Sequence, residues 1–258
     1  MTLAIIDREF EAPEDTIRRA EQKLANMHAG IQRFFADNSA SMVIEFDPQT
    51  TQNIKKVQFS SAIPNELIWE AREALQHARH SFDQTTFAAR NIVAKRTAKS
   101  VYFPWSENPA DLKRLLLSRI PPDLWDVFKS HKPYPASDAH PEGDTLIRNL
   151  ATAANKKHTV GLTIQGHINQ RFVFNGGKIA SLSFDIPRWD SVKNEAVLMR
   201  WPAGEPEPQG DHQIAFAICL DDPALAQPVE AHAALQKFTA KAKSVCESVK
   251  ARCIELRG

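Results

Sequence analysis

Residues 64–93 read PNELIWEAREALQHARHSFDQTTFAARNIV, and the spacing of their apolar side chains decides the fold. The apolar positions are Ile68, Ala71, Leu75, Ala78, Phe82, Ala89 and Val93, with Thr86 filling the remaining gap. Steps of three and four residues place all of them on one face of an α-helix. Such a face is stable in water only when other apolar surface covers it. This stretch therefore predicts a long amphipathic helix that begins near Pro64 and packs into a core.

Two other stretches of the chain carry the same pattern. The first predicts a helix from about Pro13 to Asn38, and its apolar positions are Ile17, Ala20, Leu24, Met27, Ile31 and Phe34. The second predicts a C-terminal helix of about seven turns, and its apolar positions are Leu235, Phe238, Ala242, Val245, Val249, Cys253 and Leu256. The simplest way to bury the three stripes is to pack the three helices together.

Strand patterns lie between the helices. Met42–Phe46 and Ile54–Ser60, joined by a polar turn, predict a hairpin. After His158 the apolar period changes to two, and the predicted strands are Thr159–Gln165, Gln170–Phe174, Lys178–Phe184, Ala196–Trp201 and His212–Leu220. Asn175-Gly176-Gly177 is typical of a tight hairpin turn because these residues tolerate positive φ. The fold class is therefore α+β: long amphipathic helices packed together, with a mainly antiparallel sheet in the C-terminal half.

We expect one domain over residues 1–258, in three parts. Residues 1–158 are mainly helical with a small hairpin, residues 159–221 are antiparallel strands, and residues 227–257 form a C-terminal helix that packs back on the core. Asn108-Pro109 is typical of a helix N-cap followed by the first helical residue. Pro121-Pro122 starts another short helix, and we expect His131–Gly143 to be an exposed loop rich in Pro, His and Asp.

Composition and charge limit the class of protein. Hydrophobic residues make up 43% of the chain and charged residues 24%, which excludes wholesale disorder. The 32 Lys and Arg nearly cancel the 31 Asp and Glu, so no global field steers the chain to nucleic acid or to an anionic membrane. The longest apolar run, Ile214–Leu220, is far shorter than the ~20 residues of a membrane span. With no basic start typical of a secretory signal and no Cys-x-x-Cys pair, we expect a soluble cytoplasmic protein with reduced thiols.

A row of charged residues follows one edge of the stripe in the 64–93 helix. The row consists of Arg72, Arg79, Asp83 and Arg90, and Arg79 and Asp83 are spaced to meet directly. It either binds an anionic ligand or pairs with neighbouring elements at the edge of the core. Lys156-Lys157-His158 complements the dipole at a helix end. The functional alternative brings His158 to Arg79 and Asp83, a constellation suited to proton transfer in a metal-independent ribonuclease-like enzyme.

Other motifs point to weaker alternatives. Arg72 and His77 have a spacing that resembles the ribonuclease motif of HEPN-type proteins, but five residues turn a helix so far that the two side chains lie ~140° apart. His77 and His80 lack a third ligand, so we predict no metal site. There is no Gly-rich phosphate-binding loop or other cofactor motif, so we predict no cofactor. Basic residues from Arg90 to Lys99, followed by aromatic ones that include Trp105, suit a single-stranded nucleic acid.

The segment Glu73–Asp83, EALQHARHSFD, resembles a helix of a bacterial protein group that reads roughly D-A-L-H-N-L-R-S-A-L-D-H. That group then has an aromatic-proline segment, a Q-P-Y motif and a helix ending in D-K-H-R. The counterparts in this chain are Phe103-Pro104-Trp105, Lys132-Pro133-Tyr134 and Lys156-Lys157-His158-Thr159. This sequence departs from the pattern at Gln84, Lys156 and Thr159. The group has no established activity, so the resemblance, which covers residues 60–160, implies an architecture and no reaction.

These observations leave the function open between two classes. The leading interpretation is a soluble binding or interaction protein without demonstrable catalysis, whose candidate ligand-binding residues are Arg72, Arg90, Lys157 and Trp105. The alternatives are the ribonuclease-like enzyme built on Arg79, Asp83 and His158 and the single-stranded nucleic-acid binder. The sequence is compatible with a homo-oligomer, and it does not decide whether the protein is an enzyme.

Overall fold

A computed structural model describes residues 3–94, 101–156, 158–173, 179–185, 189–207 and 211–257 of the protein. Within these ranges the chain has the predicted α+β fold, with most strands in its C-terminal half. The helices are α1 (Leu3–Asp37), α2 (Asn65–Ala94), α3 (Pro109–Arg119), the 3-10 helix η1 (Pro122–Leu124), α4 (Trp125–Ser130), α5 (Thr145–Ala154) and α6 (Ala231–Arg257). The strands are β1 (Ala40–Asp47), β2 (Gln52–Phe59), β3 (Gly161–Val173), β4 (Ile179–Asp185), β5 (Glu195–Pro202), β6 (Asp211–Asp221) and β7 (Val229–Glu230).

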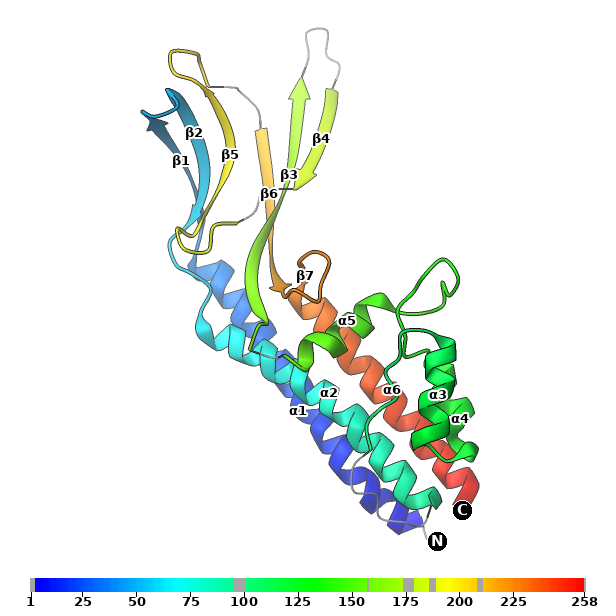
Figure 1. Ribbon diagram of the computed structural model, residues 1–258. Coiled ribbons are helices and arrows are strands. Elements are labelled where there is room, and N and C mark those ends of the chain that lie inside the picture. The colour runs from blue at the N-terminus through cyan, green and yellow to red at the C-terminus, as the bar shows by residue number, and fades with distance from the viewer. Residues whose placement is uncertain are drawn as a thin grey trace.

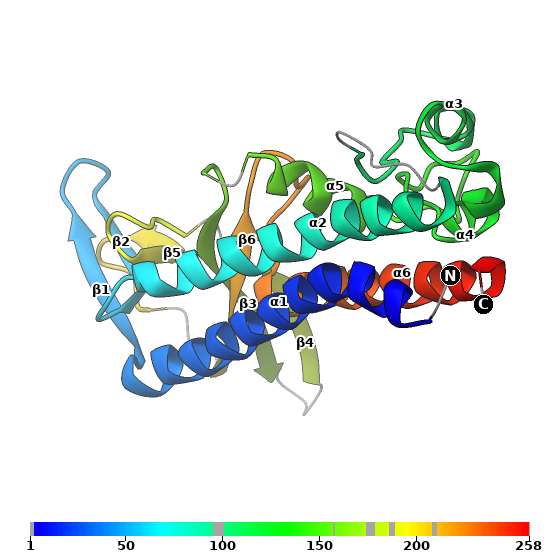
Figure 2. The same ribbon diagram turned by 90° about the horizontal axis from the view of Figure 1, so that it is seen from below.

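The three long helices α1, α2 and α6 lie side by side and bury their apolar stripes against one another (Figures 1 and 2). Fully buried side chains in this core include Phe10, Met27, Phe82 and Phe238. Gly30 of α1 leaves room for the Leu67 side chain of α2, because a Cβ there would lie 2.3 Å from Leu67 Cδ2. The predicted mutual packing of the stripes is confirmed. No helix in the described part of the chain is long and apolar enough to cross a membrane.

The first helix begins at Leu3, ten residues before the predicted start near Pro13. Ile6 and Phe10, both 0% exposed, continue the buried face toward the N-terminus. Pro13 therefore lies inside the helix, where it removes one backbone hydrogen bond. The prediction was wrong because proline is common in a first helical turn. Burial of two large side chains outweighs the lost hydrogen bond here, and only the packing reveals this.

The strands divide between two antiparallel sheets (Figure 1). The predicted hairpin is confirmed as β1 and β2, and β5 joins it to give the order β1-β2-β5. The second sheet has the order β4-β3-β6-β7. Two predicted strands, Thr159–Gln165 and Gln170–Phe174, belong to one strand of 13 residues, β3. The turn predicted at Asn175-Gly176-Gly177 lies outside the described residues.

Aromatic side chains join the sheets to one end of the helical bundle. Phe59 of β2 contacts Phe34 of α1, with ring centroids 5.7 Å apart, and Phe216 of β6, with ring centroids 4.9 Å apart. Trp189, between β4 and β5, packs on the same Phe59 ring at 5.5 Å. This aromatic cluster therefore connects both sheets to the bundle, and α1 begins and α6 ends at the opposite end (Figures 1 and 2).

The shorter helices pack beside the bundle. Asn108 caps α3 as predicted, because its side chain accepts a hydrogen bond from the Asp111 N–H at 2.9 Å. The segment predicted as an exposed loop, His131–Gly143, lacks helices and strands but is partly buried. His131 is 9% exposed and Tyr134 5% exposed, and Tyr134 donates a hydrogen bond to Glu142. The polar composition of the segment hid these inward-facing side chains.

The three cysteines, Cys219, Cys246 and Cys253, are all buried and free. Burial raises the pKa of the Cys219 and Cys246 thiols to about 11 and that of Cys253 to about 12. Because the thiolate is the reactive form, these side chains act as small apolar core residues near neutral pH.

Candidate functional site

Arg79 and Asp83 pair on α2 as their spacing predicts. Arg79 Nη1 lies 2.7 Å from Asp83 Oδ1, and the two side chains are 14% and 20% exposed. Asp83 Oδ1 also accepts the backbone N–H of Phe103 at 2.8 Å. The Arg79 guanidinium lies over the Trp105 ring, with Cζ 5.6 Å from the ring centroid. The pair therefore holds the 103–105 segment against α2, which is the role of a structural ion pair.

Arg72 has a different set of partners. Its Nε donates a hydrogen bond to the Val160 carbonyl at 2.7 Å, and its Nη2 donates to the His158 carbonyl at 3.2 Å. Its guanidinium also lies over the ring of Trp69, 5.6 Å from the centroid. Arg72 therefore fixes the backbone that enters β3, and the side chain of His158 is exposed.

The predicted meeting of Arg79, Asp83 and His158 is not found. His158 is fixed by its backbone next to Arg72, and seven residues of helix, about 10 Å of axial rise, separate Arg72 from Arg79. The Arg79 and Asp83 side chains are engaged with the 103–105 segment, and no hydrogen bond or ion pair among the described residues joins either of them to His158. Sequence spacing on α2 could not reveal this, because it says nothing of where the end of α5 packs.

The remaining candidates on α2 also have mainly structural surroundings. The helix is continuous from Asn65 to Ala94, so it has no break that could bring Arg72 and His77 onto one ligand. Burial lowers the pKa of His77. Arg90 is half-buried on the same helix. Among the described residues, no group of three or more His, Cys, Asp or Glu side chains is placed to hold a metal ion.

The aromatic segment after α2 is largely part of the core. Phe103 is 2% exposed, and the Trp105 ring packs on Phe82 with centroids 4.9 Å apart. The aromatic residues that follow the basic ones are Tyr102, Phe103 and Trp105, and of these Tyr102 alone is exposed, at 57%. Three of the basic residues in this hypothesis, at positions 95, 96 and 99, and the candidate Lys157 lie outside the described residues.

A groove of about 550 Å³ runs beside Asp83, between α1 and α2. Two of its polar side chains are engaged with neighbours: Asp83 is paired as described above, and Glu9 accepts a hydrogen bond from Asn91 at 3.4 Å. Gln84 Oε1 is buried in the lining and accepts no hydrogen bond from the described residues. The groove therefore keeps a free polar group but lacks the convergence of Arg79, Asp83 and His158 that the enzyme hypothesis requires.

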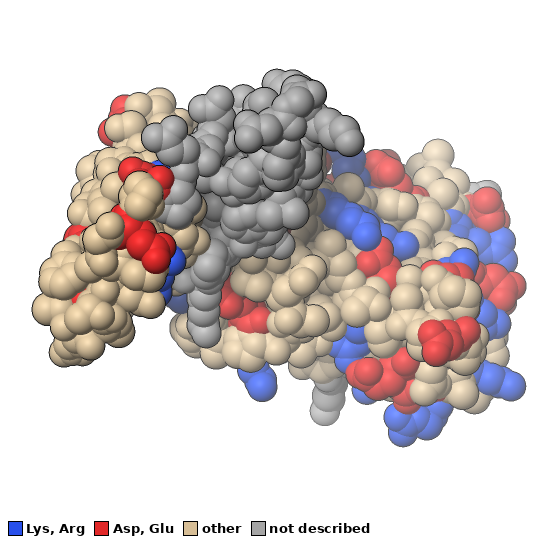
Figure 3. Space-filling model, turned by 90° about the horizontal axis from the view of Figure 1, so that it is seen from above, with Lys and Arg blue, Asp and Glu red and all other residues tan. Residues whose placement is uncertain are grey.

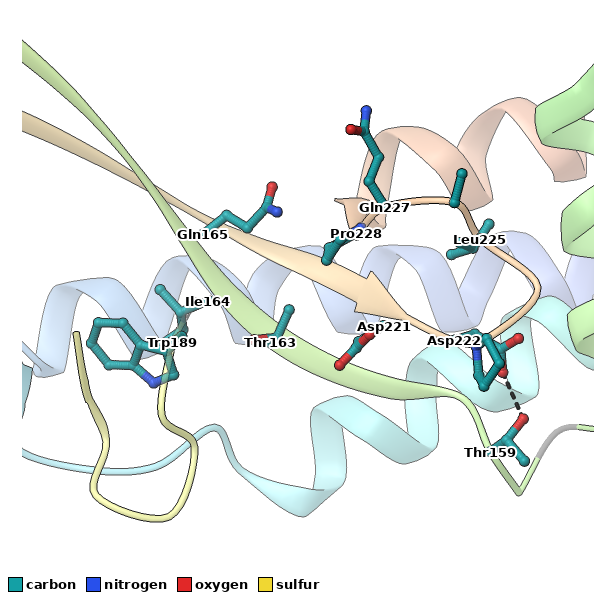
Figure 4. Close-up of a pocket in the computed structure, with 12 residues that line it drawn as sticks. Thr159, Thr163, Ile164, Gln165, Trp189, Asp221, Asp222, Leu225, Gln227 and Pro228 are labelled. Carbon is teal, nitrogen blue, oxygen red and sulfur yellow. Dashed lines mark hydrogen bonds between the residues drawn. The ribbon is translucent and has the colours of Figure 1, made fainter. Parts of the chain in front are cut away.

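A larger cleft, of about 650 Å³, opens where β3 and β6 approach the helices, and we call it the junction cleft (Figure 4). Its lining residues come from three separate parts of the chain. They are Thr159, Thr163, Ile164, Gln165, Trp189, Asp221, Asp222, Pro223, Leu225, Ala226, Gln227 and Pro228. The volume lies within the ~300–1,000 Å³ typical of small-molecule sites. Sequence reasoning missed the cleft because none of its three segments carries a recognisable motif.

Asp222 holds one end of the junction cleft together. It is 6% exposed and accepts a hydrogen bond from the Thr159 hydroxyl at 2.6 Å (Figure 4). It also accepts one from the Ala224 N–H at 2.8 Å. These bonds join the start of β3 to the loop that follows β6. A buried carboxylate needs such partners, because water cannot solvate it. The position of the loop therefore depends on Asp222.

Trp189 lies at the other end of the junction cleft. Its indole is 7% exposed and packs on Phe59 and on Phe216, at centroid distances of 5.5 and 6.5 Å. The aromatic cluster thus provides a rigid apolar wall. Leu225 and Pro228, from the loop before β7, add further apolar surface to the lining.

The polar lining of the junction cleft is acidic. It contains two carboxylates, and the described lining residues include no Lys, Arg or His. Asp222 is engaged with Thr159, whereas Asp221 is exposed at the end of β6. Thr163 and Gln227 form no side-chain hydrogen bonds to the residues that the structure describes. The cleft therefore presents one accessible negative charge and neutral polar groups beside an apolar wall.

The resemblance of residues 60–160 to the bacterial group stays a prediction, since no feature of the structure tests it. No family model matches this chain, and comparisons with curated proteins and with solved structures also found no match.

Proposed function

We propose that this protein is a binding protein that takes a small organic cation into the junction cleft. The proposal depends on one observation: the cleft combines the Asp221 carboxylate with an apolar wall, and no basic side chain is found among its described lining residues. Binding requires no catalytic group, which agrees with the engagement of Arg79 and Asp83 in structural contacts.

The charge of the cleft favours a cationic ligand. A carboxylate in a concave site is less screened than one on a flat surface, because part of the surrounding water is replaced by protein. An anionic ligand would meet this charge without a basic partner to offset it. An ammonium group close to Asp221 would gain a charge-assisted hydrogen bond.

The remaining lining suits the apolar and polar parts of such a ligand. Trp189 and Leu225 offer surface to a hydrocarbon group, and removal of that surface from water contributes about 25 cal/mol per Å². The hydroxyl of Thr163 and the amide of Gln227 can orient the ligand through hydrogen bonds. Mixed lining of this kind, apolar with a few polar groups, is typical of small-molecule sites.

Three phenyl-containing probes of similar size and different charge test the proposal. Benzylamine is cationic at neutral pH, benzyl alcohol is neutral and benzoate is anionic, and each can be titrated into the full chain by ligand-observed NMR. We expect benzylamine to bind about tenfold more tightly than benzyl alcohol, equivalent to ~1.4 kcal/mol. Equal binding of all three probes, or preference for benzoate, would contradict a cation site.

A matched pair of variants locates the binding. Asp221→Asn keeps the shape of the side chain and removes its charge, so it should abolish the preference for benzylamine and leave benzyl alcohol unaffected. Asp138→Asn is the control, because Asp138 is an exposed carboxylate outside the cleft lining. If both variants weaken benzylamine equally, the preference reflects the overall charge of the protein and the cleft is not the site.

A further inference from the structure

β1 is the outer strand of the three-stranded sheet. It pairs with β2 along its whole length, from Ala40 opposite Phe59 to Asp47 opposite Gln52. No other described strand pairs with its second edge. Figures 1 and 2 show β1 at the outside of the sheet, where it projects beyond the helices. One row of its backbone N–H and C=O groups is therefore free to pair with another strand.

This edge lacks the features that normally prevent strand pairing. Its sequence, ASMVIEFD, contains no Lys, Arg, Pro or Gly, and its eight residues run without a register shift. The opposite edge of the sheet differs, because β5 carries Arg200, ends at Pro202 and shifts register against β2 between Lys55 and Lys56. In the second sheet, the edge strand β7 has two residues, whereas the other edge strand, β4, also lacks Lys, Arg, Pro and Gly. Protective features are thus present on the β5 and β7 edges and absent from β1.

β1 also exposes a row of large apolar side chains. Met42, Ile44 and Phe46 alternate along the strand and so share one face, and they are 44%, 49% and 56% exposed. Seen from above the sheets, the three-stranded sheet at the left of Figure 3 shows few basic side chains, whereas the helical part shows many charges of both signs. An apolar row beside an unpaired edge is the usual form of a strand-pairing surface.

We propose that β1 pairs with β1 of a second copy of this chain, antiparallel and about a two-fold axis at Ile44. In this register Met42 lies opposite the partner's Phe46, and Ile44 lies opposite the partner's Ile44. The two three-stranded sheets become one six-stranded sheet with the order β5-β2-β1-β1-β2-β5. The apolar rows of the two copies then lie side by side on one face of this sheet and contact each other as cross-strand pairs.

The charges of β1 favour a second copy as the occupant. On the other face of the strand, Glu45 lies opposite the partner's Val43, and Asp47 lies opposite the partner's Ser41, so no two carboxylates meet. Glu45 is also neutralised within its own sheet by Lys56, at 2.6 Å, and Asp47 lies 3.7 Å from Arg200. Moving the axis by one residue to Val43 would set Phe46 opposite Ala40 and give poorer apolar contacts.

Sedimentation velocity of the full chain over a range of concentrations tests the dimer. We expect a monomer–dimer equilibrium with a dissociation constant on the order of 10 µM, since one strand pair is a small interface. Ile44→Lys should weaken dimerisation at least about tenfold, because it places two like charges at the axis. Leu117→Lys is the control, because Leu117 is 60% exposed on α3 and its substitution should leave dimerisation unchanged.

Cysteine cross-linking tests the register. With copper-phenanthroline and dioxygen as oxidant, the two thiols of an Ile44→Cys dimer lose two protons and two electrons and form one disulfide. The same substitution at Val43 should not cross-link, because its equivalent in the partner lies diagonally across the strands. The native chain, whose cysteines are buried, is the blank. Cross-linking at Val43 in place of Ile44 would overturn the proposed axis.

Two results would overturn the proposal as a whole. One is a chain that stays monomeric at concentrations well above the expected dissociation constant. The free edge of β1 would then pair with an extended strand of another protein. The other is a dimer that Ile44→Lys and Leu117→Lys affect equally, which would place the interface elsewhere. Circular dichroism of both variants checks that each remains folded.

Discussion

The Thr159 hydroxyl donates a hydrogen bond of 2.6 Å to the Asp222 carboxylate, and this bond connects the chain entering β3 with the loop leaving β6. Both residues line the junction cleft. On the other side of Thr159, Arg72 of α2 binds the carbonyls of His158 and Val160. A row of contacts from the helical bundle to the cleft loop therefore sets the shape of the proposed binding site.

Thr159→Val should destabilise the protein and weaken benzylamine binding. The substitution keeps the shape of the side chain but leaves a buried carboxylate short of one donor, which costs about 1–3 kcal/mol. Urea denaturation and the NMR titration measure the two effects. Thr163→Val is the matched control for stability alone, because Thr163 lines the same cleft and can contact the ligand but forms no side-chain hydrogen bond to the described residues. Equal destabilisation by both variants would show that the Thr159–Asp222 bond has no special role.

Arg79→Ala should lower stability by about 1–3 kcal/mol, because it removes the partner of a mostly buried carboxylate and the contact with Trp105. Thermal unfolding measures this loss. Arg18→Ala is the control, since the Arg18–Asp15 ion pair is exposed and should contribute less than about 1 kcal/mol.

The same Arg79 variant separates the structural role from the enzymatic alternative. A ribonuclease built on Arg79 would lose its activity on RNA in this variant while the folded protein persisted. We expect no RNA cleavage by the native chain, measured with a fluorogenic single-stranded RNA. Cleavage that Arg79→Ala or His158→Ala abolished would revive the enzyme hypothesis.

The free energy of unfolding should decrease as the pH falls from about 6.5 toward 4. These two values are the pKa of His131 in the unfolded chain and in the folded chain, respectively. Burial, with a smaller effect of Lys241, lowers the pKa of His131 to about 4, and its Nε2 lies 2.6 Å from Ser248 Oγ. Between these values the unfolded chain binds a proton that the folded chain does not, so the free energy of unfolding decreases by up to about 1.4 kcal/mol per pH unit.

Urea denaturation at several pH values measures this effect. His131→Gln should make the free energy of unfolding depend less steeply on pH between about 6.5 and 4, the range set by the two pKa values. This expectation holds whatever the effect of the substitution on stability at neutral pH. His158→Gln, at an exposed position, is the control substitution. If the two variants behave alike, acid sensitivity comes from other groups.

Gly30→Ala should displace the Leu67 side chain and change stability by less than about 1 kcal/mol. The added methyl group would lie 2.3 Å from Leu67 Cδ2, so the end of this side chain must move, and the higher helix propensity of alanine offsets that cost. A double-mutant cycle with Leu67→Ala measures the coupling. The two substitutions together should cost less than their sum, and strict additivity would contradict the close approach.

Much of the secondary structure could be predicted from local patterns. The stripe of α2, the Asn108 cap of α3 and the β1–β2 hairpin each depend on residues within a few positions of one another. The start of α1 could not be predicted in this way, because Pro13 is tolerated inside the helix through burial of Ile6 and Phe10. The sequence also identified the Arg79–Asp83 pair, since four residues on a helix suffice to bring the two side chains together.

The sequence by itself determined the three amphipathic helices and the antiparallel character of the strands, because period and turn chemistry act over short distances along the chain. Only the tertiary structure decided that β5 pairs with the N-terminal hairpin, that His158 lies next to Arg72 rather than Arg79, and that three distant segments enclose the junction cleft. The physical reason is that strand partners and cleft walls are chosen by the packing of whole elements, and no local pattern in the chain records that choice.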